Sequence, residues 1–208
     1  MLSAPTRAVL LVLLSVLLFL GLLFQRRQNR HGTRGGRISA PKVAWLFYAL
    51  YFWFIVCPAV ALDAAVAPEA RLVLGLFGAS MWVRGTAELY MLYVSKSWRP
   101  PYGIGHDVFC ILLVLGALGW HHAHWSGPLT ATDGWALALI MLVLVSLVVE
   151  IAYAALFFHA VAGETTGEEG LWFADEQQAR FRRINQLTFT FNVPLYGALA
   201  GLLAWGLL

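Results

Sequence analysis

Charged side chains are scarce in this chain of 208 residues, because Asp, Glu, Lys and Arg make up 12% of it, against roughly a quarter of a soluble domain. Cysteine occurs twice, which argues against a disulfide framework. The chain has no Walker loop and no GxGxxG, HExxH, GxSxG or CxxCH sequence, so the common nucleotide, hydrolase and haem-attachment motifs are absent. Most residues are apolar: the chain is 60% hydrophobic with a mean hydropathy of +0.72, which is typical of a membrane protein.

Long apolar stretches predict an all-α fold, a polytopic membrane helix bundle with six transmembrane helices, since a span needs about 20 apolar residues. We expect these spans at residues 8–24, 43–66, 70–94, 107–125, 134–160 and 187–208. They form one integral-membrane domain over residues 1–208, with the lipid bilayer as its main partner. The largest connection, 161–186, contains Leu171, Trp172 and Phe173, and it predicts a cytoplasmic loop with a short interfacial helix.

The cations between spans predict the orientation of the chain, because Lys and Arg near span ends stay on the cytoplasmic side. Three connections on one side carry most of them: Arg26, Arg27, Arg30, Arg34, Arg37, Lys42, Lys96, Arg99, Arg180, Arg182 and Arg183. Only Arg7 and Arg71 fall on the opposite side. This pattern predicts that both termini are periplasmic in a plasma membrane of the bacterial inner-membrane type. It also explains the net charge of +3, so we expect no nucleic-acid partner.

Three charged residues lie inside predicted spans, namely Arg84, Glu88 and Glu150. A charge near the bilayer centre costs about 2.5–3.5 kcal/mol on insertion scales, so it persists where it is paired, hydrated or needed for function. Arg84 and Glu88 are four residues apart and share a helix face. Two carboxylates against one guanidinium leave a surplus negative charge, which a proton or a cation would neutralise. A purely structural ion-pair network that holds the bundle together is the alternative.

Polar residues of the last two spans extend this intramembrane polar site. Asn192 and Tyr196 repeat at a spacing of four with Thr188, and Tyr153 shares a face with Glu150. The predicted site therefore contains Arg84, Glu88, Glu150, Tyr153, Asn192 and Tyr196. We expect glycines to let the third and sixth spans approach closely and bring these faces together: Gly75, Gly78, Gly85, Gly197 and Gly201.

Histidines and acids at the outer ends of the spans predict a second candidate site. A Cu or Zn ion could bind there to His121, His122, His124, Asp63 and Asp133, because imidazole and carboxylate groups are ligands for such metals. Each group also has a structural explanation. The histidines can belong to an interfacial aromatic belt, and Asp133 can cap the fifth span.

One further histidine pair lies at the cytoplasmic ends of the fourth and fifth spans. His106 and His159 could ligate a metal or a single haem b between adjacent helices. Asp107, next to His106, is interpreted as the N-cap of the fourth span.

These features favour a small integral-membrane subunit of a redox or energy-converting complex, with other membrane subunits as partners. Nine tryptophans and thirteen phenylalanines exceed what interfacial anchoring needs, so a quinone is a candidate cofactor beside Cu, Zn and haem b. A proton- or metal-cation-coupled transporter is one alternative. A membrane enzyme that acts on a lipid-soluble substrate is another. The sequence does not choose among these three.

Overall fold

The computed structural model describes residues 4–28, 40–95, 100–125, 127–161 and 179–207, where all the regular structure is helical. The helices are α1 (Ala4–Gln28), α2 (Ala40–Tyr51), α3 (Cys57–Ala61), α4 (Pro68–Tyr93), α5 (Pro100–His124), α6 (Ala131–Val161) and α7 (Ala179–Leu207), with a π-helical turn at Phe52–Val56 that makes α2 and α3 one continuous rod.

Four segments among the described helices are long and apolar enough to cross a membrane: Val43–Ala61, Tyr102–His124, Ala131–Leu156 and Gln186–Gly206. Helix α1 adds the shorter apolar segment Val12–Phe24. Helix α4 is long enough to span a bilayer, but it carries four charged residues and is not among these four. The described fold is therefore all-helical, with several apolar helices of membrane-spanning length.

Two helices begin before the spans predicted within them. Helix α5 begins at Pro100, seven residues before the expected start, because prolines at a helix start lack only N–H groups that have no intrahelical partner there. Helix α7 begins at Ala179, eight residues before the predicted span 187–208, whereas its apolar segment of membrane-spanning length begins at Gln186. The interfacial helix expected at Leu171, Trp172 and Phe173 lies outside the described residues.

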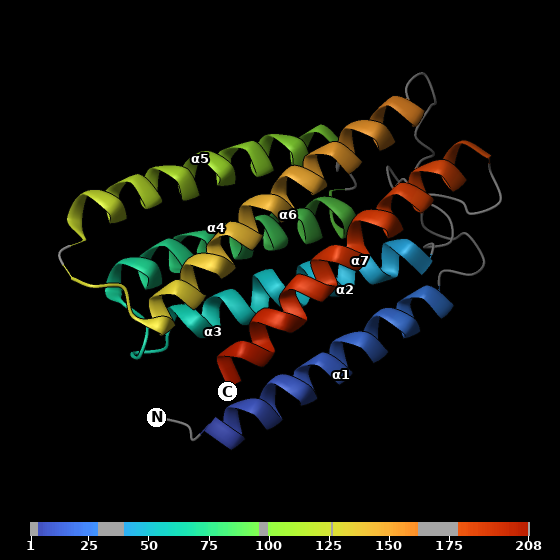
Figure 1. The fold of residues 1–208 in the computed structure, drawn as a ribbon. Helices are drawn as coiled ribbons and strands as arrows, with labels where there is room; N and C mark the ends of the chain where they lie inside the picture. Colours follow the sequence, from blue (N-terminus) through green and yellow to red (C-terminus); the bar gives the residue numbers. More distant parts are fainter. Residues whose placement is uncertain (1–3, 29–39, 96–99, 126, 162–178, 208) are drawn as a thin grey trace.

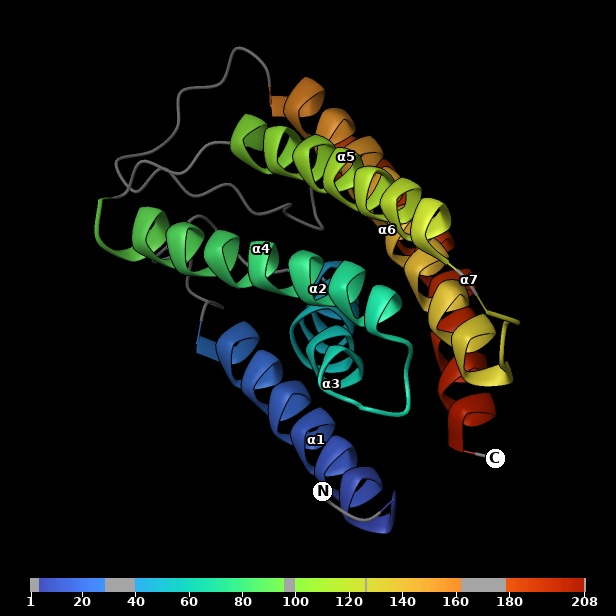
Figure 2. The same cartoon turned by 90° about the vertical axis from the view of Figure 1, so that its left-hand side faces the viewer.

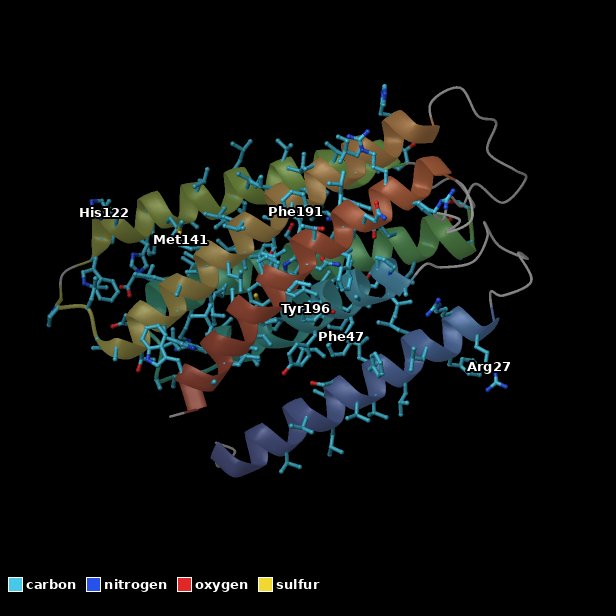
Figure 3. All side chains as sticks on the ribbon, turned by 45° about the vertical axis from the view of Figure 1, so that its right-hand side comes forward. Arg27, Phe47, His122, Met141, Phe191 and Tyr196 are labelled. Carbon is cyan, nitrogen blue, oxygen red and sulfur yellow. The ribbon has the colours of Figure 1, made fainter. Side chains whose placement is uncertain are left out.

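Consecutive rods run in alternating directions, so that connected helix ends gather at two opposite ends of the bundle (Figure 1). The basic end carries Arg26 and Arg27 at the end of α1 and Arg182 and Arg183 near the start of α7. The histidine end carries His121, His122 and His124 in the last turn of α5. Figure 3 shows Arg27 and His122 at these opposite ends.

Helix α6 is apolar on all sides: it packs against α5, α7 and α4, and its remaining surface exposes Met141, Val145 and Val148. It contributes Ala136, Leu139, Ile140, Val143 and Leu147 to the core, and each of these side chains is buried. The core continues across α4 and the α2–α3 rod. Its largest fully buried side chains there are Tyr48, Phe52, Leu74, Phe77 and Met81.

The π-helical turn lies just before Pro58, where the rod must accommodate a residue with no N–H group. Pro58 cannot donate to the carbonyl of Phe54, and its ring would clash with that carbonyl in a regular α-helix. The backbone widens instead, and Cys57 N–H donates to the oxygen of Phe52, five residues earlier.

Helix α1 stands apart from the other rods and contacts α2 (Figure 2). Leu22 packs against Val43, and the rings of Phe19 and Phe47 meet edge to face at 5.8 Å. Most of the remaining α1 side chains that the structure describes are exposed and apolar. This surface suits contact with lipid tails.

The glycines do not join α4 to α7 as predicted. Those of α4 face the α2–α3 rod: a Cβ at Gly78 would lie 3.3 Å from Pro58 Cγ, and one at Gly85 would lie 2.8 Å from Phe54 Cε1. Gly197 and Gly201 have no neighbouring atom within 4 Å of a Cβ position. They line an open apolar groove between α6 and α7. The close approach therefore occurs between neighbours in sequence, because a short connection at 62–67 joins α3 to α4.

Replacing Gly85 with Ala should lower the free energy of unfolding by about 1–3 kcal/mol, because Phe54 must move to admit the new methyl group. The matched control is Gly197→Ala, where the methyl group meets open space. Thermal unfolding in detergent measures both. Equal stability of the two variants would contradict the close packing of α4 on Phe54.

Candidate functional site

The candidate site is centred on Arg84, whose side chain reaches from α4 to α5. Arg84 Nε donates to Glu88 Oε1 at 3.0 Å, one turn further along α4. Arg84 Nη1 donates to Asp107 Oδ1 on α5. The side chains become less exposed in the order Glu88 at 28%, Arg84 at 11% and Asp107 at 0%. One guanidinium therefore holds two carboxylates, and the deeper of them is completely removed from solvent.

Asp107 was missed by the sequence interpretation, which assigned it as a helix N-cap. That assignment is wrong, because α5 begins at Pro100 and places Asp107 inside the helix, where it is fully buried. Gly103, one turn earlier on the same face, makes room for the guanidinium: a Cβ there would lie 3.2 Å from Arg84 Nη2. A helix that begins at Pro100 places Gly103 and Asp107 on one face, and this spacing is the sequence signal for the buried Asp107.

Glu150 comes to the same centre from α6. It interacts electrostatically with both Arg84 and Asp107. Its Oε2 atom is buried and has no hydrogen-bond partner, and the same is true of Asp107 Oδ2. Three helices thus bring three carboxylates around one guanidinium. In the described part of the chain, these charges leave a formal surplus of two negative charges, one more than the sequence interpretation counted.

The polar stripe of α7 faces the interior. Thr188 and Asn192 are buried, and Tyr196 is partly buried. Tyr196 donates its hydroxyl hydrogen to the carbonyl of Ala44 on α2. Neither Asn192 Oδ1 nor Asn192 Nδ2 has a hydrogen-bond partner, although the side chain is 2% exposed.

A second set of polar contacts ties α7 to α2 and α6. The hydroxyl groups of Tyr48 and Ser146 are 2.6 Å apart, and Ser146 also donates to the carbonyl of Leu142. The rings of Tyr48 and Tyr196 lie 5.4 Å apart, and Tyr196 also stacks on Phe47 (Figure 3). The predicted site residue Tyr153 is partly buried three positions after Glu150 on α6.

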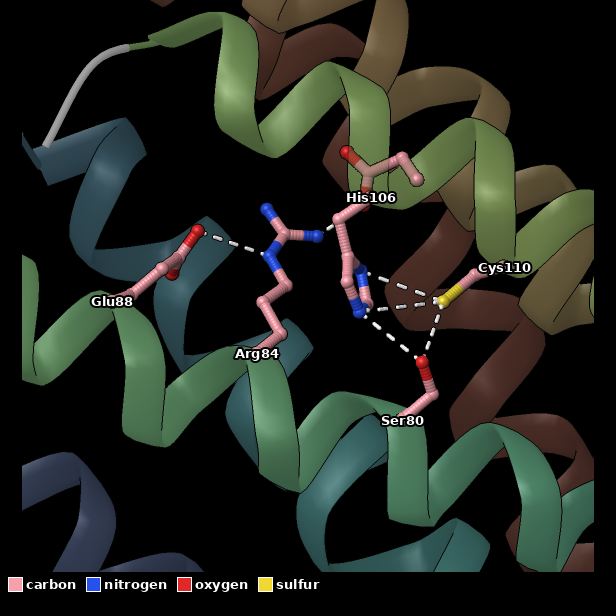
Figure 4. Close-up of polar contacts among 6 residues, drawn as sticks. Ser80, Arg84, Glu88, His106 and Cys110 are labelled. Atoms are coloured by element: carbon pink, nitrogen blue, oxygen red, sulfur yellow. Dashed lines mark hydrogen bonds and ion pairs between the residues drawn. The ribbon is translucent and has the colours of Figure 1, made fainter.

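His106 lies beside the Arg84 centre but faces Ser80 and Cys110 (Figure 4). Its Nε2 atom is 3.1 Å from Ser80 Oγ, and its Nδ1 atom is 3.5 Å from Cys110 Sγ. The predicted partner His159 is exposed near the end of α6. Glu150 of the same helix interacts with Asp107, the neighbour of His106. His159 lies roughly 14 Å further along α6 than Glu150. The structure therefore does not bring His106 and His159 together.

The three histidines of the histidine end do not share a common set of contacts. His121 is buried and stacks on Trp125 at 4.9 Å, while its Nε2 atom has no partner. His124 stacks on Trp120 and donates from Nδ1 to the carbonyl of Trp120 at 2.8 Å. His122 is exposed. The aromatic partners of two of the three rings match the alternative explanation as an aromatic belt.

The acids of this end hold backbone groups. Asp133 accepts hydrogen bonds from the N–H and hydroxyl of Thr130, and Asp133 N–H donates to Thr130 Oγ1 in return, which is a reciprocal cap of α6. Asp63 accepts from Ala65 N–H. Asp133 also interacts electrostatically with His121. Across the described ranges, three or more His, Cys, Asp or Glu residues nowhere come together in a group that could hold a metal ion.

Comparison with known family models, with curated proteins and with solved structures gives no match for this chain.

Proposed function

We propose that this chain is an integral-membrane protein that takes up and releases a proton at Glu150, as a small subunit of a redox or energy-converting membrane complex. The observation that carries the proposal is the imbalance of charge at the buried centre. Arg84 is hydrogen-bonded to Glu88 and Asp107, whereas the Oε2 atom of Glu150 is buried without any partner. A buried carboxylate oxygen without a hydrogen-bond donor is a place where a proton can bind, since the bound proton removes the unsatisfied charge.

A role in proton movement through a membrane requires the centre to lie within the bilayer. We propose that all six rods cross the membrane, with the basic end on the cytoplasmic side and both termini on the periplasmic side of a bacterial inner membrane. The distribution of Arg26, Arg27, Arg182 and Arg183 supports this orientation. The exposed apolar surface of α1 supports contact with lipid or with another membrane subunit.

Infrared spectroscopy of the protein in liposomes tests the proposal directly, because a protonated carboxyl group has a carbonyl band that an ionised one lacks. A pH titration should reveal such a band, and Glu150→Gln should remove it. Glu69→Gln is the matched control, because Glu69 lies in the first turn of α4 at the far end of the bundle. A band that persists in Glu150→Gln, or no band at any pH in the folded protein, would refute the assignment.

A cation-coupled transporter is the second candidate, and one observation favours it. The formal surplus of two negative charges around Arg84 equals the charge of one divalent cation, although the three carboxylates do not form a grouped metal site in this conformation. Uptake of Zn²⁺ or Mn²⁺ by liposomes that contain the purified chain, abolished by Glu150→Gln, would favour this function. Loss of proton transfer in the intact complex, without cation uptake by the isolated chain, would favour the energy-converting subunit.

A further inference from the structure

The residues between the buried carboxylates and the basic end differ from those between the carboxylates and the histidine end. Towards the basic end, polar residues continue on α4 and α7. Glu88 is more exposed than Arg84 and lies five residues before the end of α4. On α7 the inward face carries Asn192 and then Thr188, both buried.

Asn192 lies at the level of Glu150. The Tyr48 side chain contacts both Ser146 on α6 and Tyr196 on α7, which fixes the relative height of these two helices. They run in opposite directions (Figure 1), so one turn towards the basic end leads from Ser146 to Glu150 and from Tyr196 to Asn192.

Three helices thus present unpartnered buried atoms at one level: Asp107 Oδ2 on α5, Glu150 Oε2 on α6 and both amide atoms of Asn192 on α7. Buried polar atoms of this kind are normally satisfied by ordered water, and an internal water needs two to four such partners. These four atoms include both donors and acceptors, so each of the three side chains can hydrogen-bond to internal water.

Towards the histidine end the interior is apolar. Beyond Ser146 the inward face of α6 carries Val143, Ile140, Leu139 and Ala136, and this stretch is about 15 Å long. We call the side chains that fill this half of the bundle the apolar plug: Leu74, Phe77, Met81, Val114, Leu139 and Val143, each at most 1% exposed. None of these six side chains has a group that can carry a proton, although Trp53 Nε1, a buried donor without a partner, lies beside Phe77.

We propose that Glu150 exchanges protons with water at the basic end alone, through a hydrated path beside Asn192 and Thr188, and that the apolar plug closes the histidine end. The inference rests on the proposed function of Glu150. In the transfer, a hydronium ion gives its proton to Glu150 Oε2 and becomes water, which lowers the surplus negative charge of the centre by one. Among the charged and titratable groups of the neighbouring helices, Arg84 and Asp107 interact electrostatically with Glu150. The others are Glu88 on α4, His106 and Cys110 on α5, Tyr153 on α6, Tyr48 on α2 and Tyr196 on α7.

The test uses the full chain inserted into liposomes in a single orientation. Proteolysis from outside the liposomes verifies this orientation. A rapid pH change is applied to one side, and the carboxyl band of Glu150 is followed in time. The band should respond to the basic end at least about tenfold faster than to the histidine end, because an apolar layer raises the barrier to proton transfer. Equal rates from the two sides would overturn the inference.

Two variants locate the path. Asn192→Leu should slow the response from the basic end by about tenfold or more, while Asn192→Asp, which keeps a polar group, should not. Phe191→Leu is the control, because Phe191 is exposed beside Asn192. If Asn192→Leu does not fold, Thr188→Val replaces it. An unchanged rate in the folded variant would exclude this path. Absence of any Glu150 band would instead refute the proposed function, so the two failures are distinguishable.

Discussion

Replacing Arg84 with Gln should lower the free energy of unfolding by about 3–5 kcal/mol, the largest electrostatic effect that we expect in this chain. The substitution leaves Asp107, which is fully buried, and Glu88 without the guanidinium that holds both of them. It also removes the cation that interacts with Glu150. Loss of one partner is costly because the remaining charge stays buried without compensation.

Thermal unfolding in detergent measures the Arg84→Gln effect, and a double variant gives it a specific control. Arg84→Gln combined with Asp107→Asn should recover much of the lost stability, because the neutral amide no longer needs a cation. Arg183→Gln should leave stability nearly unchanged, since Arg183 is exposed at the basic end. If Arg84→Gln unfolded at the wild-type temperature, the ion pairs would not hold α4 to α5.

Replacing Phe77 with Ala should also lower the free energy of unfolding by about 3–5 kcal/mol, here through lost packing. Phe77 is fully buried, and its ring meets Trp53 edge to face at 6.1 Å. The substitution leaves a cavity between α4 and the α2–α3 rod that rigid helices cannot close. The lost contacts therefore have no replacement.

Leu76→Ala is the matched control for Phe77, because it removes an apolar side chain from the next position of α4, where Leu76 is exposed. Unfolding by detergent titration or heat should show a clear loss for Phe77→Ala and a small change for Leu76→Ala. Similar losses in the two variants would mean that α4 faces its neighbours differently from the arrangement described.

Helices were predictable from composition and pattern, and their ends were less so. Apolar stretches of membrane-spanning length predict helices wherever they occur, because the backbone must satisfy its own hydrogen bonds in lipid. The start of α5 was misplaced at Asp107, whereas the helix begins at Pro100, because proline is tolerated in the first turn of a helix. The reciprocal cap of Thr130 and Asp133, by contrast, follows from local sequence.

The sequence by itself determined that charges occur within apolar helices and that Arg84 and Glu88 share one face, since both facts depend on composition and on the 3.6-residue period. Only the tertiary structure decided that Asp107 is the buried partner of Arg84 and that His106 faces Cys110 and not His159. It also decided that Glu150 Oε2 has no partner. The reason is physical: pairing between helices depends on their relative height and rotation, which packing of the whole bundle sets and no single helix records.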